Sequence, residues 1–217
     1  MTAAQPDNQV TGGVRSLEVR WIFPGQAGTA VAGWFGRFPA AVESREDAYL
    51  VDPQLRGLSV KIRGGRALEV KVYRGSPGIL EVAGRARGRM ESWQKWSFPT
   101  AALSQGGAAP AGWVPVHKRI SQFPAAGGQI RGRVTEPGAE PGCVVELTEV
   151  HRHSEAWWTL GFEATGPTSL LRRELEATAT LVLTQALPDA MKLDTDRSQS
   201  YAEWLGSQPG AGTGPDA

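Results

Sequence analysis

Three segments in the first part of the chain alternate apolar and polar side chains with a period of two, and most of their polar positions carry charge. The segments are SLEVRWIF (16–23), LSVKIR (58–63) and ALEVKVY (67–73). In the first of them, Glu18 and Arg20 fall on one side while Val19 and Trp21 fall on the other. Because successive side chains of a β-strand point to opposite faces, this pattern indicates strands whose two faces meet different surroundings.

Further strands and three helices are expected along the rest of the chain. The same alternation or β-rich composition predicts strands at 47–51, 79–83, 87–98, 113–123, 129–135, 143–151 and 157–165. Turns are expected at Gly64–Gly65 and at the Pro-Gly pairs that begin with Pro77, Pro137 and Pro141. Helices are expected at 29–38, 167–187 and 201–205, and the first two have apolar residues at helical spacing.

The charged residues lie at the centres of the expected strands and not at their ends. They include Glu18, Arg20, Lys61, Arg63, Glu69, Lys71, Lys118, Arg119, Glu146 and Glu163. A half-exposed sheet also alternates apolar and polar residues, but its outer face usually carries Thr, Ser and Gln as well. The sequence therefore predicts a mainly β (α+β) fold. We expect a single antiparallel β-barrel with its charged faces inward and a few helices covering the apolar outer faces.

Composition limits the number of domains and the kinds of partner. One domain is expected at 16–205, with disordered tails at 1–15 and 206–217 that are small, polar and rich in Gly and Pro. Since 23 Lys and Arg nearly balance 22 Asp and Glu, no nucleic-acid partner is expected. The single Cys143 excludes an internal disulfide, and the first sixteen residues lack the apolar core of a signal peptide. No apolar run approaches the roughly 20 residues that cross a bilayer, so a cytoplasmic protein with no membrane partner is expected.

A lumen lined by both signs of charge suits a metal-bound polyphosphate. Carboxylates bind divalent cations through their oxygen atoms, while Lys and Arg bind phosphate oxygens, Arg in a bidentate manner. With water excluded, a bound cation would polarise the terminal phosphoryl group and orient an attacking water molecule. This chemistry makes a triphosphate or polyphosphate the expected ligand.

Six parts of the sequence form an ordered set of motifs: SLEVRW, VKIR with LEVKV, GRMESW, VPVHKR, CVVELTEV with WWTLGFEATG, and SQSYAEWL. Taken in this order, they resemble the CYTH family, also called triphosphate tunnel metalloenzymes. They stand where the family has its ExExK signature, paired basic strands, RxE strand, a further basic strand, late acidic strands and an SY-x-x-L element. The resemblance covers about 16 to 205 and implies a tunnel-shaped barrel that acts on triphosphates.

The resemblance also implies roles for individual residues. It implies a catalytic set of Glu18, Arg20 and Lys71, and metal ligands Glu18, Glu146 and Glu163 for Mg²⁺ or Mn²⁺. The implied phosphate-binding residues are Lys61, Arg63, Lys71, Arg89, Lys118 and Arg119. Since neighbouring residues of a strand point to opposite faces, the choice between Lys118 and Arg119 is open. Ser16 stands where the signature has its first glutamate, which removes one carboxylate ligand.

Two functions follow from this resemblance. The first is metal-dependent hydrolysis of a small-molecule triphosphate, inorganic or organic, within the barrel. The alternative is a non-catalytic barrel that binds polyphosphate or a nucleotide and has lost the first signature glutamate. A third candidate, a lipocalin-like carrier suggested by the eight tryptophans, is disfavoured by the charged inner faces. The family resemblance also makes a homodimer a candidate assembly.

Overall fold

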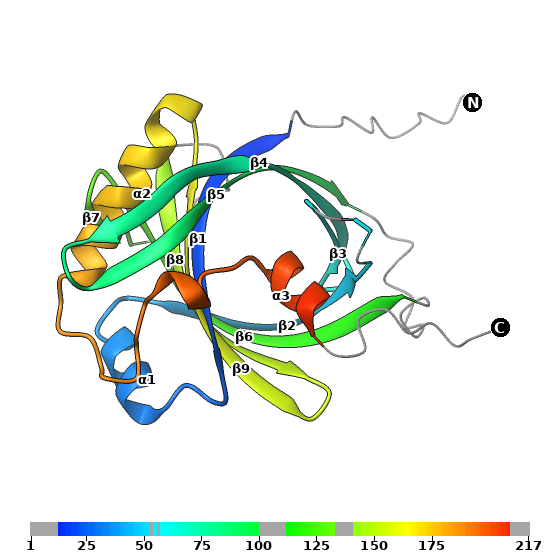
Figure 1. The fold of residues 1–217 in the computed structure, drawn as a ribbon, viewed down its shortest axis with the longest axis horizontal. Coiled ribbons are helices and arrows are strands. Elements are labelled where there is room, and N and C mark those ends of the chain that lie inside the picture. The colour runs from blue at the N-terminus through cyan, green and yellow to red at the C-terminus, as the bar shows by residue number, and fades with distance from the viewer. Residues whose placement is uncertain (1–12, 53, 56, 100–111, 133–140, 209–217) are drawn as a thin grey trace, which may run out of the picture.

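Eight antiparallel strands form a closed barrel in the computed structural model, which describes residues 13–52, 54–55, 57–99, 112–132 and 141–208 (Figure 1). The barrel strands are β1 (Val14–Pro24), β2 (Ala41–Leu50), β3 (Leu58–Arg63), β4 (Ala67–Val82), β5 (Ala86–Pro99), β6 (Trp113–Ala126), β8 (Gly142–Arg152) and β9 (Glu155–Thr165). A two-residue strand, β7 (Gln129–Ile130), pairs with the end of β6. The predicted fold class, a single antiparallel β-barrel with a few helices, is confirmed.

The pairing of β2 with β6 closes the barrel. The strands follow each other in the order β2-β3-β4-β5-β1-β9-β8-β6, and the last pairs back to β2 from Ala41 opposite Gln122 to Leu50 opposite Trp113. Closure removes the free edges whose unpaired N–H and C=O groups would otherwise need partners. Alternate side chains of each strand are thereby divided between a lumen and an outer surface, and eight strands leave room inside for side chains or one small ligand.

The main hydrophobic core lies outside the barrel wall, under helices α1 (Thr29–Phe35) and α2 (Thr168–Leu183). Both helices lie on one side of the barrel in Figure 1. Trp21 and Phe162 from the wall pack with Phe35 of α1 and Leu175 of α2, and all four side chains are almost completely buried. Each such side chain contributes about 1.5–3 kcal/mol when fully buried. The apolar strand faces therefore point outward, as the alternation predicts, and the charged faces point inward.

The C-terminal segment fills the region where two barrel strands separate. β1 and β5 pair only as far as Glu18 opposite Glu91 within the described register. Beyond that point, Ser198 bridges to Trp21 of β1, and its Oγ accepts a hydrogen bond from the backbone N–H of Arg89 at 2.8 Å. A 3-10 turn (Thr195–Arg197) precedes this contact, and helix α3 (Tyr201–Ser207) follows it.

Helix α3 lies within one end of the barrel ring (Figure 1). Its Trp204 and Leu205 are each 1% exposed and belong to a second, smaller apolar cluster with Tyr49 of β2 and Val116 of β6. Those two strand residues share the inner face with the charged positions of the same strands. The apolar face of α3 therefore fills this end of the barrel.

One predicted turn is absent from the structure. A turn at Pro77 and a separate strand at 79–83 were expected, but β4 runs without a break from Ala67 to Val82, so this prediction was wrong. The pairing of β4 with β5 instead shifts register on either side of Gly75, and Gly75 and Gly78 have φ angles of 121° and 119°. Glycine adopts such angles without steric cost, so bulges absorb the extra residues and the strand continues.

Other element boundaries also differ from expectation. β2 begins at Ala41, well before the expected 47, and α2 ends at Leu183 instead of 187. In place of the strand expected at 129–135 the structure has the short β7, while positions 133–135 and the turn at Pro137 lie outside the described residues. The expected tails at 1–15 and 206–217 also fall mostly outside them; β1 begins at Val14 and α3 extends to Ser207.

Within the described residues, every helix lacks the length or the apolar character that crossing a lipid bilayer would require.

A substitution at Gly88 can test the close contact between β5 and β1. A Cβ atom at Gly88 would lie 2.5 Å from side-chain atoms of both Val19 and Trp21, whereas one at Gly33 in α1 would meet nothing within 4 Å. We expect Gly88→Ala to lower the free energy of unfolding by about 1–3 kcal/mol through overpacking. Gly33→Ala, the control, should leave it unchanged or raise it by up to about 1 kcal/mol. Urea unfolding followed by tryptophan fluorescence measures both, and a Gly88→Ala protein as stable as the wild type would contradict the packing described.

Candidate functional site

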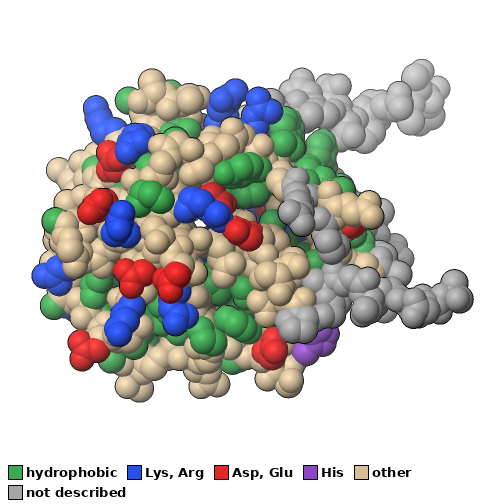
Figure 2. Space-filling view, in the orientation of Figure 1, with side chains coloured by type: hydrophobic (Ala, Val, Ile, Leu, Met, Phe, Trp, Pro, Cys, Tyr) green, Lys and Arg blue, Asp and Glu red, His purple; other side chains and the backbone are tan. Residues whose placement is uncertain are grey.

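A cavity of about 930 Å³ occupies the barrel lumen and is lined mainly by charged side chains. Nine Lys and Arg against five Glu line it among the described residues: Arg20, Arg45, Lys61, Arg63, Lys71, Arg89, Lys95, Lys118 and Arg131, with Glu18, Glu69, Glu91, Glu146 and Glu163. On the outer face shown in Figure 2, by contrast, basic and acidic side chains are interspersed. The described lining of the lumen therefore carries more positive than negative side chains.

The structure brings nearly all of the predicted site residues into this cavity. The choice left open between Lys118 and Arg119 falls on Lys118, which lines the lumen, whereas Arg119 lies on the outer surface and pairs with Glu149. The inner face of β6 includes Val116, Lys118 and Ile120, so the side chain of Arg119 must point outward. Arg119 therefore does not belong to the phosphate-binding set that the resemblance implies.

Among the described residues, six further charged residues of the lumen were not predicted as site residues. They are Arg45 and Asp47 of β2, Glu69 of β4, Glu91 and Lys95 of β5, and Arg131 after β7. A signal for Lys95 was present, because it lies an even number of positions from the predicted Arg89 along one strand. Arg45 was missed because AVESRE is polar on both faces and shows no alternation, whereas Asp47 lies within the strand expected at 47–51 but was given no role there.

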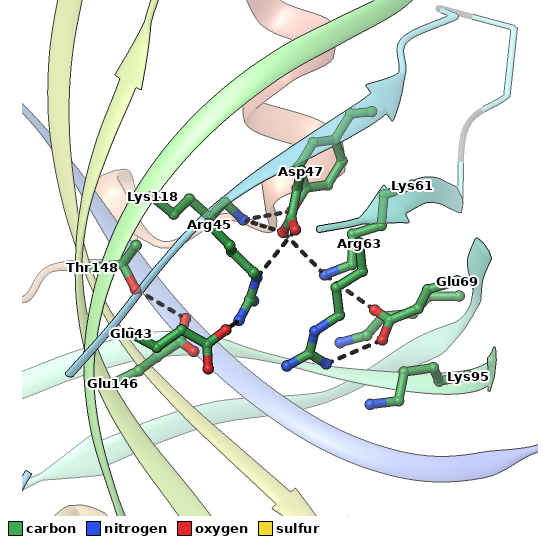
Figure 3. Close-up of polar contacts among 12 residues, drawn as sticks. Glu43, Arg45, Asp47, Lys61, Arg63, Glu69, Lys95, Lys118, Glu146 and Thr148 are labelled. Atoms are coloured by element: carbon green, nitrogen blue, oxygen red, sulfur yellow. Dashed lines mark hydrogen bonds and ion pairs between the residues drawn. The ribbon is translucent and has the colours of Figure 1, made fainter. Parts of the chain in front are cut away.

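Asp47 lies at the centre of a group of basic side chains (Figure 3). Its carboxylate is fully buried and lies 3.1 Å from Arg45 Nε, 3.6 Å from Lys61 Nζ and 3.5 Å from Lys118 Nζ. Burial alone would raise the pKa of Asp47, but Lys61, Lys118 and Arg45 outweigh it and lower the pKa. Asp47 is therefore a fixed anion that holds three cations from three strands.

Glu69 continues this group towards β4 (Figure 3). Its carboxylate contacts Lys61 Nζ and Arg63 Nη1, each at 3.1 Å. Burial alone would raise the pKa of Glu69, but Lys61 and Arg63 hold it well below its usual range. Lys61 thus bridges two carboxylates, and the Arg63 side chain remains 38% exposed to the cavity and solvent.

A second group links β1, β4 and β9 through Lys71. Lys71 Nζ donates a 2.6 Å hydrogen bond to Glu18 Oε1 and lies 3.5 Å from Glu163 Oε1. Glu18 and Glu163 are directly opposite each other in the β1–β9 register. Ser16 Oγ also donates to Glu18 Oε1 at 2.6 Å, and Lys95 Nζ lies 3.9 Å from Glu163. Although burial would raise the pKa of Glu163, Lys71 and Lys95 lower it to about 2.

Arg20 and Glu146 form the third group. Arg20 Nη1 lies 2.6 Å from Glu146 Oε1 and donates to Thr159 Oγ1 at 2.9 Å. The guanidinium carbon lies 4.5 Å from the ring centroid of Tyr201, which belongs to α3. At Gly161 a Cβ atom would approach the same guanidinium to 2.8 Å, so the glycine leaves the space that Arg20 occupies. Arg20 therefore connects the barrel wall to the helix that fills one end.

Lys118 is enclosed between two tyrosines near that end. Its Nζ donates to Tyr49 Oη at 2.6 Å and lies 3.8 Å from the centroid of the Tyr201 ring. Burial lowers the pKa of Lys118, whereas its contacts with Tyr49 and Asp47 oppose that shift. Lys118 is thus held in place by a carboxylate and two aromatic rings, and it borders the closed end of the cavity.

The expected metal ligands do not form a metal site in this arrangement. Within the described ranges, no group of three or more His, Cys, Asp or Glu side chains is arranged to hold a metal ion. Glu18 and Glu163 both contact Lys71, and Glu146 is paired with Arg20. These lumen carboxylates are therefore paired with Lys and Arg. Their arrangement does not fit the Mg²⁺ or Mn²⁺ site that the resemblance implies.

The fold and the lumen together define an antiparallel β-barrel with an ion-paired, predominantly basic interior. No protein-family model matches the sequence, and a search of curated proteins likewise finds no match. The CYTH resemblance thus remains an expectation based on the sequence fragments.

The two arginine–glutamate pairs allow a comparison of buried and exposed charge. The side chains of Arg20 and Glu146 are 11% and 20% exposed, against 57% and 34% for Arg119 and Glu149. Arg20→Met leaves a carboxylate without its partner inside the barrel, and we expect a loss of about 3–5 kcal/mol in the free energy of unfolding. Arg119→Met, the matched control, should cost less than about 1 kcal/mol. Similar urea midpoints for the two variants would contradict this assignment of inside and outside.

The contacts of Glu163 with lysine make the free energy of unfolding depend on pH in the acid range. Its pKa is about 2 in the folded protein, against 4.5 for the free side chain, so its contribution is fully present above about pH 5 and is lost as the pH falls towards 2. We expect Glu163→Gln to lower the free energy of unfolding by up to about 3 kcal/mol at pH 7. The difference in this free energy between wild type and variant should decrease steadily below pH 5. Urea unfolding at a series of pH values measures this difference. Gln at the exposed Glu155 is the control, and a difference independent of pH would refute the assignment.

Proposed function

We propose that this protein binds a linear triphosphate or polyphosphate, inorganic or attached to an organic group, inside the barrel. The observation that carries this proposal is the excess of Lys and Arg over Glu around the cavity in the barrel lumen. A ligand with several negative charges along a chain would balance that excess. Arg and Lys are also the side chains best suited to phosphate oxygens, which accept short, charge-assisted hydrogen bonds.

The arrangement of the basic groups supports a chain-like anion. Eight of the nine come from six strands, β1 to β6, and Arg131 follows β7, so the basic groups are spread around most of the cavity instead of forming one patch. Some remain available: the carboxylate contact of Lys95 is 3.9 Å long, and Arg63 is partly exposed. The cavity volume also lies within the range of about 300–1,000 Å³ that is typical of small-molecule sites.

Hydrolysis of the bound triphosphate is the second candidate function. The opposed positions of Glu18 and Glu163 favour it, because they are two of the three carboxylates that the resemblance implies as ligands of the metal used in hydrolysis. Both carboxylates are nevertheless held by Lys71, and the expected metal ligands do not form a group. Binding without turnover is therefore the function that the geometry supports best.

Titration with tripolyphosphate tests the proposal. We expect the ligand to raise the melting temperature of the wild type by mass action, and calorimetry should give a dissociation constant that increases with salt. Lys95→Met removes a lumen cation with a long carboxylate contact, so binding should weaken by about tenfold or more, equivalent to 1.4 kcal/mol. Arg119→Met, on the outer surface, should bind as the wild type does.

Two results would count against the proposal. Absence of binding, or equal affinity in the Lys95→Met and wild-type proteins, would remove the lumen as the binding site. Phosphate release from tripolyphosphate or ATP, measured in the same samples, would favour the hydrolase over the binding protein.

A further inference from the structure

Lys71 occupies the space between two carboxylates that face each other across β1 and β9. Its Nζ is 2.6 Å from Glu18 Oε1 and 3.5 Å from Glu163 Oε1, so one ammonium group contacts both. The side chain is only 18% exposed, and it reaches these groups from β4, on the other side of β5 in the barrel order. A cation that belongs to the chain itself therefore lies where the sequence resemblance implies a divalent metal.

The charges around this ammonium are already balanced. Glu18 and Glu163 supply two negative charges, and Lys71 and Lys95 supply two positive charges within 4 Å of them. A divalent cation added here would meet the Lys71 ammonium at close range in a partly desolvated lumen, where repulsion between like charges is strong. It would also have to replace the charge-assisted hydrogen bond from Lys71 to Glu18.

Ser16 accounts for the reduced negative charge. Its hydroxyl lies on the lumen side of β1 and donates a 2.6 Å hydrogen bond to Glu18 Oε1, the same oxygen that Lys71 contacts. A carboxylate at that position would add a third negative charge and repel Glu18. With the neutral Ser16 hydroxyl at this position, Glu18 accepts hydrogen bonds from one hydroxyl and one ammonium. Its charge is then balanced without a divalent cation.

We propose that Lys71 is a built-in counter-ion for the Glu18–Glu163 pair, taking the position of a divalent cation, and that the barrel binds polyphosphate without metal. This inference rests on the proposed function for its ligand. It goes further by defining the bound species as the free polyphosphate anion and not its magnesium complex. It also identifies Lys71 as a positioning residue that keeps two carboxylates from repelling the ligand.

Wild-type protein tests the inference directly. Tripolyphosphate binding is measured by calorimetry once with excess EDTA and once with MgCl₂ or MnCl₂. We expect affinity in EDTA to equal or exceed that with metal, because the metal competes for the free anion. Binding that disappears in EDTA and returns with magnesium would overturn the inference while leaving the proposed function intact.

A second measurement needs no phosphate ligand, so it separates failure of this inference from failure of the proposed function. Lys71→Met keeps a long side chain but leaves Glu18 and Glu163 facing each other without the ammonium. We expect Mg²⁺ or Mn²⁺ alone to raise the melting temperature of Lys71→Met and to leave that of the wild type unchanged. Lys192→Met, which removes an exposed lysine, is the matched control and should behave as the wild type.

The outcomes of this second measurement are also decisive. A wild-type protein stabilised by either metal alone would overturn the inference, as would a folded Lys71→Met variant indifferent to both. If Lys71→Met does not fold, the comparison of wild-type binding in EDTA and in magnesium decides the question. If tripolyphosphate binds under neither condition, the proposed function fails and the metal response of the two proteins still tests the role of Lys71.

Discussion

Pairing of opposite charges inside a narrow barrel is the interaction on which the rest of this structure depends. A charge taken out of water is costly unless another charge or several hydrogen bonds compensate it. Asp47, Glu69, Glu163 and Glu146 each lie within 4 Å of at least one Lys or Arg from another strand. Because the partners come from different strands, these pairs also connect neighbouring and more distant strands of the wall. The polar interior is thus part of what holds the barrel in one register.

The architecture reverses the usual positions of polar and apolar groups. Most of the apolar core lies outside the wall, where α2 covers β1, β8 and β9 and Phe35 of α1 packs on Phe123 of β6, while the inside of the wall is charged. A sheet of this kind needs a second layer to shield its outer face, and the helices provide it on one side. The same side chains that stabilise the wall therefore leave the lumen free for an anionic ligand.

The sequence was sufficient to predict the barrel class, the inward direction of the charged faces and most of the lumen residues. Alternation at Glu18, Lys61 and Lys71 carried that information because a strand reverses its side chains at every residue. The sequence was insufficient where a local pattern predicted one structure and contacts between distant strands produced another. A Pro-Gly pair at Pro77 usually marks a turn, but here bulges keep β4 continuous. The first half of β2 was missed because both of its faces are polar, and the pairing of Lys71 with two glutamates depends on strand neighbours that no local pattern encodes.

The position of α3 after all the barrel strands has a consequence for how the barrel forms. Contacts such as Arg20 with Thr159 join residues 139 positions apart, so much of the wall depends on distant partners, and folding of this topology belongs to the slower range for single domains. During synthesis the N-terminal strands emerge long before β9 can pair with β1 and before α3 can enter the ring. Until β9 and α3 have been made, the charged faces of the earlier strands are hydrated, and lumen ion pairs such as that of Lys71 with Glu163 form only when these later segments are in place.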